Sequence, residues 1–226
     1  MCSGCTTPAV PVAPCNDRCV VQNEELEKVR SFCYLGDTLS SSGGSDAAVT
    51  TRIRCAWRKF HELAPFLAAR ATPLKLKGKV YGACVRSAMI YGSETWAMKN
   101  SHMEKLERAD NAMVRRMCGV RLCDRRRSED LRAKLGLLDI ATIVLRRSRL
   151  WWFGHVQRRE DSDWIRKAFL LQVEGRRAVG RPRKTWEQTI AEDLRVLQLN
   201  PDLVHDRAKW KQEVWKRSSN PVGRDK

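Results

Sequence analysis

The chain has 226 residues, and 42% of them are hydrophobic, which suffices for one good core or two small ones and argues against wholesale disorder. Its formal net charge of +17 is concentrated, because residues 51–90 and residues 146–186 each carry a net charge of +8. Such concentration indicates that the basic clusters bind a polyanion, usually a phosphate backbone. The alternative, that these basic faces are only solvated, is less favoured. No segment has the long apolar face that an acidic membrane surface would require.

No targeting signal is expected at the N-terminus. Its first residues, MCSGCTTPAVPVAPC, have neither the basic region nor the apolar stretch of a signal peptide, and no apolar run reaches transmembrane length. We therefore expect a protein of the nucleus or cytoplasm, neither secreted nor inserted in a membrane. Its nine cysteines are then expected to be reduced thiols.

Residues 1–23 are predicted to be a disordered tail rich in Pro and Cys. A zinc site in this tail would use the thiolates of Cys2, Cys5, Cys15 and Cys19. Three residues separate the second pair, and three prolines interrupt the loop between the pairs. The sequence therefore favours no bound metal.

Residues 24–45 are predicted to form a short β-hairpin, because residues 29–39 are apolar and β-prone and the turn-rich SSSGGS follows. A bundle of helices is predicted for residues 46–120. The signals that begin or end its helices are Asp46, Thr72, Pro73, Ser101 and Gly119. Apolar residues on two faces of the helix that follows Pro73 predict a central, buried position for it.

Residues 121–226 are predicted to be a basic, helical extension. Its helices are expected to begin near Ser128, Asp139, Thr185, Asn200 and Pro201. The apolar helical positions Trp57, Trp151 and Trp210 are predicted to lie in hydrophobic cores, and His155 to hydrogen-bond between helices. The predicted fold class is therefore mostly α, with one short β-hairpin near the N-terminus.

Six sequence blocks occur in a recognisable order: FCYLGDTLSSSGG, RIRCAWRKFHEL, MIYGSETW, MVRRMCGV, RLWWFGHVQRRE and GRPRKTW. In this order they resemble the C-terminal part of the polyprotein of non-LTR retrotransposons, of the LINE type and RTE-like. The resemblance covers about residues 25–215. It implies a primer-grip hairpin that contains Phe32, Tyr34, Leu35 and Gly36, followed by a helical, thumb-like assembly and a C-terminal extension.

The resemblance also implies that basic helices hold a template–primer, which would be RNA, an RNA–DNA hybrid or DNA. Such contacts to phosphates fix position without reading sequence. The basic residues expected at this interface are Arg52, Arg54, Arg58, Lys59, Arg146, Arg147, Arg149, Arg176, Arg177, Arg181, Arg183 and Lys184. The sequence leaves the oligomeric state open.

The chain is not expected to be an enzyme as it stands. Reverse transcription requires metal ions held by clustered carboxylates, commonly a Y-x-D-D motif, and this motif is absent. Magnesium would belong to the polymerase palm that this chain lacks, so no cofactor is expected. The four histidines are scattered, without metal-ligand spacing or a nucleophile beside them.

The segment GRPRK, which contains Arg181 and Arg183, leaves three interpretations open. It resembles an AT-hook, which inserts Arg-Pro-Arg into the minor groove of A·T-rich DNA, and this would suit a co-opted DNA-binding or chromatin-associated protein. It could instead contact phosphates generally, or form a basic loop before the helix at Thr185. A translated remnant without function is a further alternative.

Overall fold

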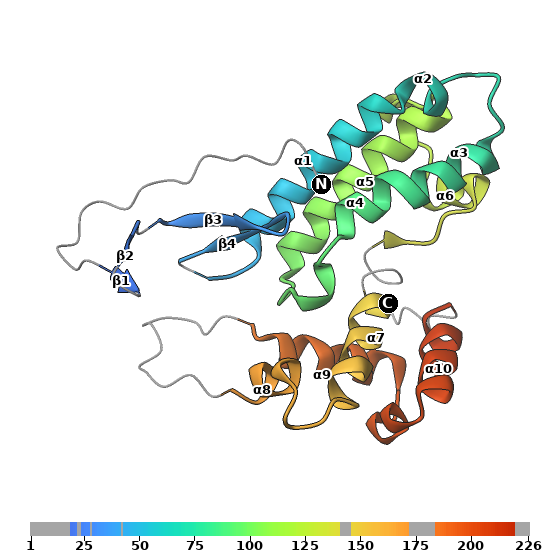
Figure 1. Cartoon of the computed structure of the whole chain (residues 1–226). Helices are drawn as coiled ribbons and strands as arrows, with labels where there is room; N and C mark the ends of the chain where they lie inside the picture. The colour runs from blue at the N-terminus through green and yellow to red at the C-terminus, as the bar shows by residue number, and fades with distance from the viewer. Residues whose placement is uncertain are drawn as a thin grey trace.

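The computed structural model describes residues 19–21, 24–27, 29–41, 43–140, 146–171 and 184–219. The described chain is mostly helical, with short strands near the N-terminus, which confirms the predicted fold class (Figure 1). Several predicted site residues lie outside the described residues: Cys2, Cys5, Cys15, Arg176, Arg177, Arg181 and Arg183.

The strands form two separate antiparallel pairs. Strand β3 (Ser31–Tyr34) pairs with β4 (Asp37–Ser40) and makes the predicted hairpin. A second pair, β1 (Cys19–Val21) with β2 (Glu24–Leu26), was not predicted. Its strands have three residues each, too short for a periodic signal in the sequence.

The hairpin turns at Leu35 and Gly36, whose φ angles are 49° and 77°. Two successive residues with positive φ give a turn whose twist matches that of the two strands. A Cβ at Gly36 would lie 3.1 Å from the Nη2 atom of Arg52, so the turn packs closely against this side chain. The turn is thus seated directly on the first helix.

A first helical module follows the hairpin. Its elements are α1 (Asp46–Glu62), α2 (Ala64–Leu67), α3 (Leu74–Val80), the π-helical turn η1 (Tyr81–Arg86), α4 (Ser87–Ile90), the 3-10 turn η2 (Ser93–Thr95), α5 (Asn100–Cys118), the 3-10 turn η3 (Leu122–Asp124) and α6 (Ser128–Leu135). Elements α3, η1 and α4 run on as one helical segment that begins near the predicted Pro73. Fully buried side chains of α1, η1 and α5, such as Phe60, Tyr81 and Met113, form its core.

Two helices of this module begin differently from the prediction. Ser45 rather than Asp46 is the N-cap of α1, and α5 begins one residue before the predicted cap at Ser101. The reason is a contact between the two helix starts: the buried His102 donates from Nε2 to Asp46 Oδ1 at 2.7 Å. The hydrogen bonds to His102 and Lys99 lower the pKa of Asp46 to about 2.

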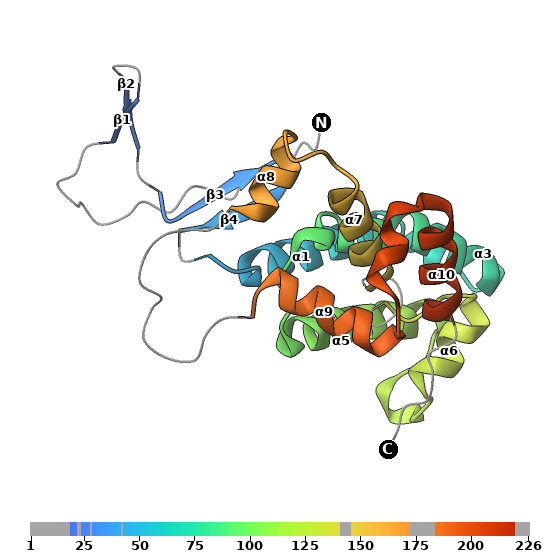
Figure 2. The ribbon, with the colours of Figure 1, turned by 90° about the horizontal axis from the view of Figure 1, so that it is seen from below.

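A second helical module consists of α7 (Arg146–Gln157), α8 (Trp164–Leu170), α9 (Trp186–Leu197), the 3-10 turn η5 (Pro201–His205) and α10 (Arg207–Ser219). Figure 2, seen from below, shows these helices in front of the first module. The predicted cap at Thr185 is confirmed, since its hydroxyl accepts from Gln188 N at 3.2 Å while Gln188 Oε1 accepts from Thr185 N at 3.0 Å.

Each module has its own hydrophobic cluster. The buried residues of the first lie between Ala48 and Ile140, and those of the second between Leu150 and Val214. Leu131 and Leu135 of α6 belong to the first cluster. The packing therefore divides the chain after residue 140, later than the predicted boundary between residues 120 and 121.

Candidate nucleic-acid interface

The hairpin β3–β4 turns its apolar face outward. Phe32, Tyr34 and Leu39 are 50%, 56% and 54% exposed. The opposite face, with Cys33 and Thr38, is half-buried and lies on α1, where Thr38 Oγ1 is 3.3 Å from Thr51 Oγ1. Since a two-stranded sheet normally buries its apolar face, this hairpin is inverted.

The outward rings form a short platform. Phe32 and Tyr34 are stacked, with ring centroids 6.1 Å apart and an interplanar angle of 25°. Leu39 pairs with Phe32 across the strands, and Leu35 at the turn is 75% exposed. Three of the four residues implied for a primer-grip hairpin are therefore on the surface, and the fourth, Gly36, makes the turn.

The predicted cations of α1 fall into different environments. Arg54 and Arg58 are exposed and one helical turn apart, so they lie on one face of the helix. Arg54 has no hydrogen bond or ion pair in the part of the chain that the structure describes, whereas Arg58 Nη2 lies 3.8 Å from Cys55 Sγ. Lys59 pairs with Glu62 at 2.8 Å.

Arg52 is buried beneath the hairpin turn and is only 7% exposed. Its guanidinium lies over the ring of Tyr91, 4.3 Å from the centroid. Its Nε and Nη2 atoms have no hydrogen-bond partner among the described residues. Because it is enclosed in this way, Arg52 is not part of the exposed basic surface of α1.

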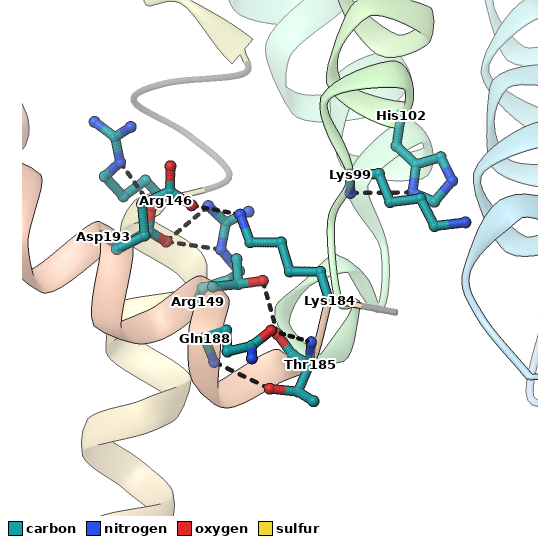
Figure 3. A network of polar contacts seen from close by, with 10 residues as sticks. Lys99, His102, Arg146, Arg149, Lys184, Thr185, Gln188 and Asp193 are labelled. Atoms are coloured by element: carbon teal, nitrogen blue, oxygen red, sulfur yellow. Dashed lines mark hydrogen bonds and ion pairs between the residues drawn. The ribbon is translucent and has the colours of Figure 1, made fainter. Parts of the chain in front are cut away.

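The predicted arginines at the start of α7 are engaged inside the second module (Figure 3). Arg146 and Arg149 both pair with the buried Asp193 of α9, at 2.9 and 2.7 Å. Arg147 donates to Ser218 Oγ at 3.0 Å and lies 3.8 Å from the ring centroid of Trp215. These three side chains tie α7 to α9 and α10, so they are not part of an exposed basic surface either.

Lys184, the last residue of the GRPRK segment, is its one described residue, and its ammonium pairs with Glu192 of α9. This hydrogen bond lowers the pKa of Glu192. The three interpretations of GRPRK stay predictions, since Arg181 and Arg183 lie outside the described residues.

One exposed basic segment was missed by the sequence analysis. The connection between α5 and α6 contains Arg121, Arg125, Arg126 and Arg127, and every residue from 121 to 127 is exposed. The signal was present as four arginines within seven residues. The cluster was not recognised because charge was summed over residues 91–145, which together carry a net charge of only +3.

Most of the tryptophan predictions are confirmed, and that for His155 is wrong. Trp210 is 1% exposed, and Trp57 packs against the core at half burial, as Trp151 does in the second module. His155 instead stacks on Trp152 of its own helix, 5.2 Å away, and accepts from Arg159 at 3.3 Å. Partial burial and the positive charge of Arg159 lower its pKa.

Within the described residues, no group of three or more His, Cys, Asp or Glu side chains is arranged to hold a metal ion. None of the helices that the structure describes is both long and apolar enough to cross a membrane.

The chain is similar to a Caenorhabditis elegans protein named as an uncharacterized, transposon-derived protein. The two are 24% identical over 212 residues, which cover 87% of this chain and 74% of the relative. No family model matches the chain, and no solved structure matches it. The similarity supports a transposable-element origin.

Proposed function

We propose that this chain is a nucleic-acid-binding remnant of a LINE-type reverse transcriptase, which holds a template–primer but does not polymerise. The similarity to a transposon-derived protein supports the origin, and the six ordered sequence blocks support the specific family. The absence of a Y-x-D-D motif supports the lack of polymerase activity.

The observation that carries the proposal is the inverted hairpin. Two stacked aromatic rings, Phe32 and Tyr34, face away from the protein, where the bases of a strand can stack on them. Stacking on an aromatic side chain contributes about 1–3 kcal/mol per base and tolerates any sequence. The hairpin therefore suits the end of a single strand rather than the outside of a duplex.

Exposed cations stand beside this platform. Thr51, which the hairpin contacts, is three residues from Arg54, so the Cα atom of Arg54 lies about 5 Å further along the helix axis. Arg58 follows one turn later on the same face. We infer that the platform takes bases and that α1 takes the phosphates that join them.

The proposal is tested by the affinity for labelled single-stranded RNA, RNA–DNA hybrid and duplex DNA at two salt concentrations. We expect the Phe32→Ala/Tyr34→Ala variant to bind single strands at least about tenfold more weakly. The matched variant Phe32→Tyr/Tyr34→Phe, which keeps both rings, should bind within about twofold of the original chain. Arg54→Gln should lower the slope of affinity against salt by about one.

Two outcomes would contradict the proposal. The first is no binding to any of the three nucleic acids at low salt. The second is equal binding by the double-alanine and ring-retaining variants, which would leave the hairpin without a role. Primer extension with magnesium and nucleotides tests the proposed lack of polymerase activity, and we expect no product.

A further inference from the structure

The α5–α6 connection, residues 119–127, is an arginine loop that presents its cations outward. Arg121, Arg125, Arg126 and Arg127 have no hydrogen bond or ion pair from their side chains in the described part of the chain. The buried Arg86 differs, since it pairs with Asp110. A cluster of unpaired cations costs self-repulsion, which a bound polyanion removes.

The backbone of the arginine loop is fixed by its own contacts. Gly119 ends α5 with a φ of 65°, and Arg125 has a φ of 47°. The acidic residue in the loop, Asp124, uses one carboxylate oxygen to accept from Arg121 N at 2.7 Å. The local carboxylate therefore holds the turn together and leaves the four guanidinium groups to solvent.

Two open depressions border the arginine loop. One open depression of about 520 Å³ is lined by Val120, Asp124, Arg125 and Arg126. Another of about 400 Å³ is lined by Arg127, Ser128, Glu129 and Arg132. Guanidinium groups around a depression can bind phosphate oxygens with two parallel hydrogen bonds each, which lysines cannot do.

The arginine loop and the hairpin lie at opposite ends of the first module. Helices α1 and α5 run side by side in the same direction, because Asp46 contacts His102 at one end and His61 contacts Arg116 at the other. The hairpin packs on the first half of α1, and both figures show it on one side of the module with α6 on the other. The 19 residues of α5 span about 28 Å, which corresponds to about eight nucleotides of one strand.

We propose that the arginine loop is a second binding site for nucleic-acid phosphates, and that it holds the same molecule as the hairpin about eight nucleotides away. This inference rests on the proposed function. Nucleic acid is favoured over an anionic membrane because Leu122, 79% exposed, is the one large apolar side chain exposed in the loop. One leucine buries too little apolar area to anchor a protein in lipid.

The test compares single strands of about four and about twenty nucleotides, since only the longer one can reach from the hairpin to the loop. We expect the variant Arg125→Gln/Arg126→Gln/Arg127→Gln to bind the long strand at least about tenfold more weakly and the short strand unchanged. Its slope of affinity against salt should fall by about two to three for the long strand only. These side chains make no hydrogen bond or ion pair within the described protein, so the unfolding midpoint should not fall and should rise slightly as self-repulsion is removed.

A matched control removes the same charge elsewhere. Arg195, Arg207 and Lys216 are exposed on the second module, and their triple glutamine variant should bind both strands alike. A loop variant that binds the long strand as tightly as the unaltered chain, or weakens both strands equally, overturns this inference and leaves the hairpin proposal standing. Loss of binding to phosphatidylserine vesicles, with nucleic-acid affinity unchanged, would assign the loop to a membrane surface instead. Failure of the unaltered chain to bind either strand overturns both proposals.

Discussion

Arg52 and Arg86 are both buried arginines of the first module, 7% and 5% exposed, in opposite electrostatic situations. Arg86 donates two hydrogen bonds of 2.8 Å to the carboxylate of Asp110, and the hydroxyl of Tyr81 donates to the same carboxylate at 2.8 Å. Burial raises the pKa of Tyr81 well above its usual value, so the phenol stays a donor. Arg52 has no carboxylate partner among the described residues and lies over the ring of Tyr91.

This difference predicts opposite results for the same substitution. Arg86→Met leaves the carboxylate of Asp110 buried without its counter-ion, so the free energy of unfolding should fall by about 3–5 kcal/mol. Arg52→Met replaces a desolvated, incompletely bonded cation with an apolar chain of similar length, and the change should stay within about 1 kcal/mol. Urea unfolding of the two variants measures both values. A large loss for Arg52→Met would mean that its guanidinium has a stronger partner than Tyr91.

At the scale of elements, a glycine lies at a close approach of two helices in each module. In the first, Gly78 of α3 lies against the carbonyl of Leu135 in α6, and a Cβ would overlap that oxygen. In the second, Gly154 of α7 lies against the indole of Trp210, which donates to Leu150 O at 2.9 Å. The glycine of the WWFGHV block is therefore explained by helix packing.

Gly78 and Gly82 give a matched pair, one helical turn apart in the same helical segment. We expect Gly78→Ala to lower stability by about 1–3 kcal/mol or more, because a backbone carbonyl cannot move aside as a side chain can. At Gly82 a Cβ would meet only Leu137 Cδ2 at 3.8 Å, an ordinary contact. Gly82→Ala should then be neutral or stabilise by up to about 1 kcal/mol through helix propensity. Urea unfolding measures both variants. Similar losses of stability in the two would show that the close approach of α3 to α6 is not the reason why residue 78 must be glycine.

The sequence predicted the hairpin, the positions of most helices and the cap at Thr185, because these depend on residues close together in the chain. It failed where burial depends on distant partners. The segment α3–η1–α4 was expected to be buried on two faces, yet only the face with Tyr81 and Met89 is buried, while Leu76 is 45% exposed. Periodicity shows which residues share a face but not whether another element covers it.

The same limit applied to the arginines. Arg146 was assigned to the interface as one of a basic run, but its partner Asp193 lies 47 residues further along the chain. No local pattern reveals such a pair. The arginine loop, in contrast, was visible as a local cluster and was missed only because charge was summed over a long window.

At the scale of the whole molecule, the two modules meet at the short segment that contains η2. Trp186 at the start of α9 donates from Nε1 to Glu94 O at 2.7 Å, and Trp96 donates to Asp37 of the hairpin at 3.3 Å. Trp186 also contacts Phe153 and Phe169, with ring centroids 6.3 and 5.9 Å apart. One segment thus connects the hairpin to the second module, while each module keeps a separate core.

Separate cores with a narrow junction predict that the modules unfold separately once the junction is weakened. Trp186→Phe keeps an aromatic ring against Phe153 and Phe169 but removes the donor to Glu94, at a cost of about 1 kcal/mol. We expect amide hydrogen exchange to speed up about fivefold in α7, α9 and α10 and to stay unchanged in α1 and α5. Trp164→Phe is the matched control, because Trp164 is 81% exposed and should affect neither module. If amide exchange in the Trp186→Phe variant speeds up equally in both modules, the two cores unfold as one cooperative unit.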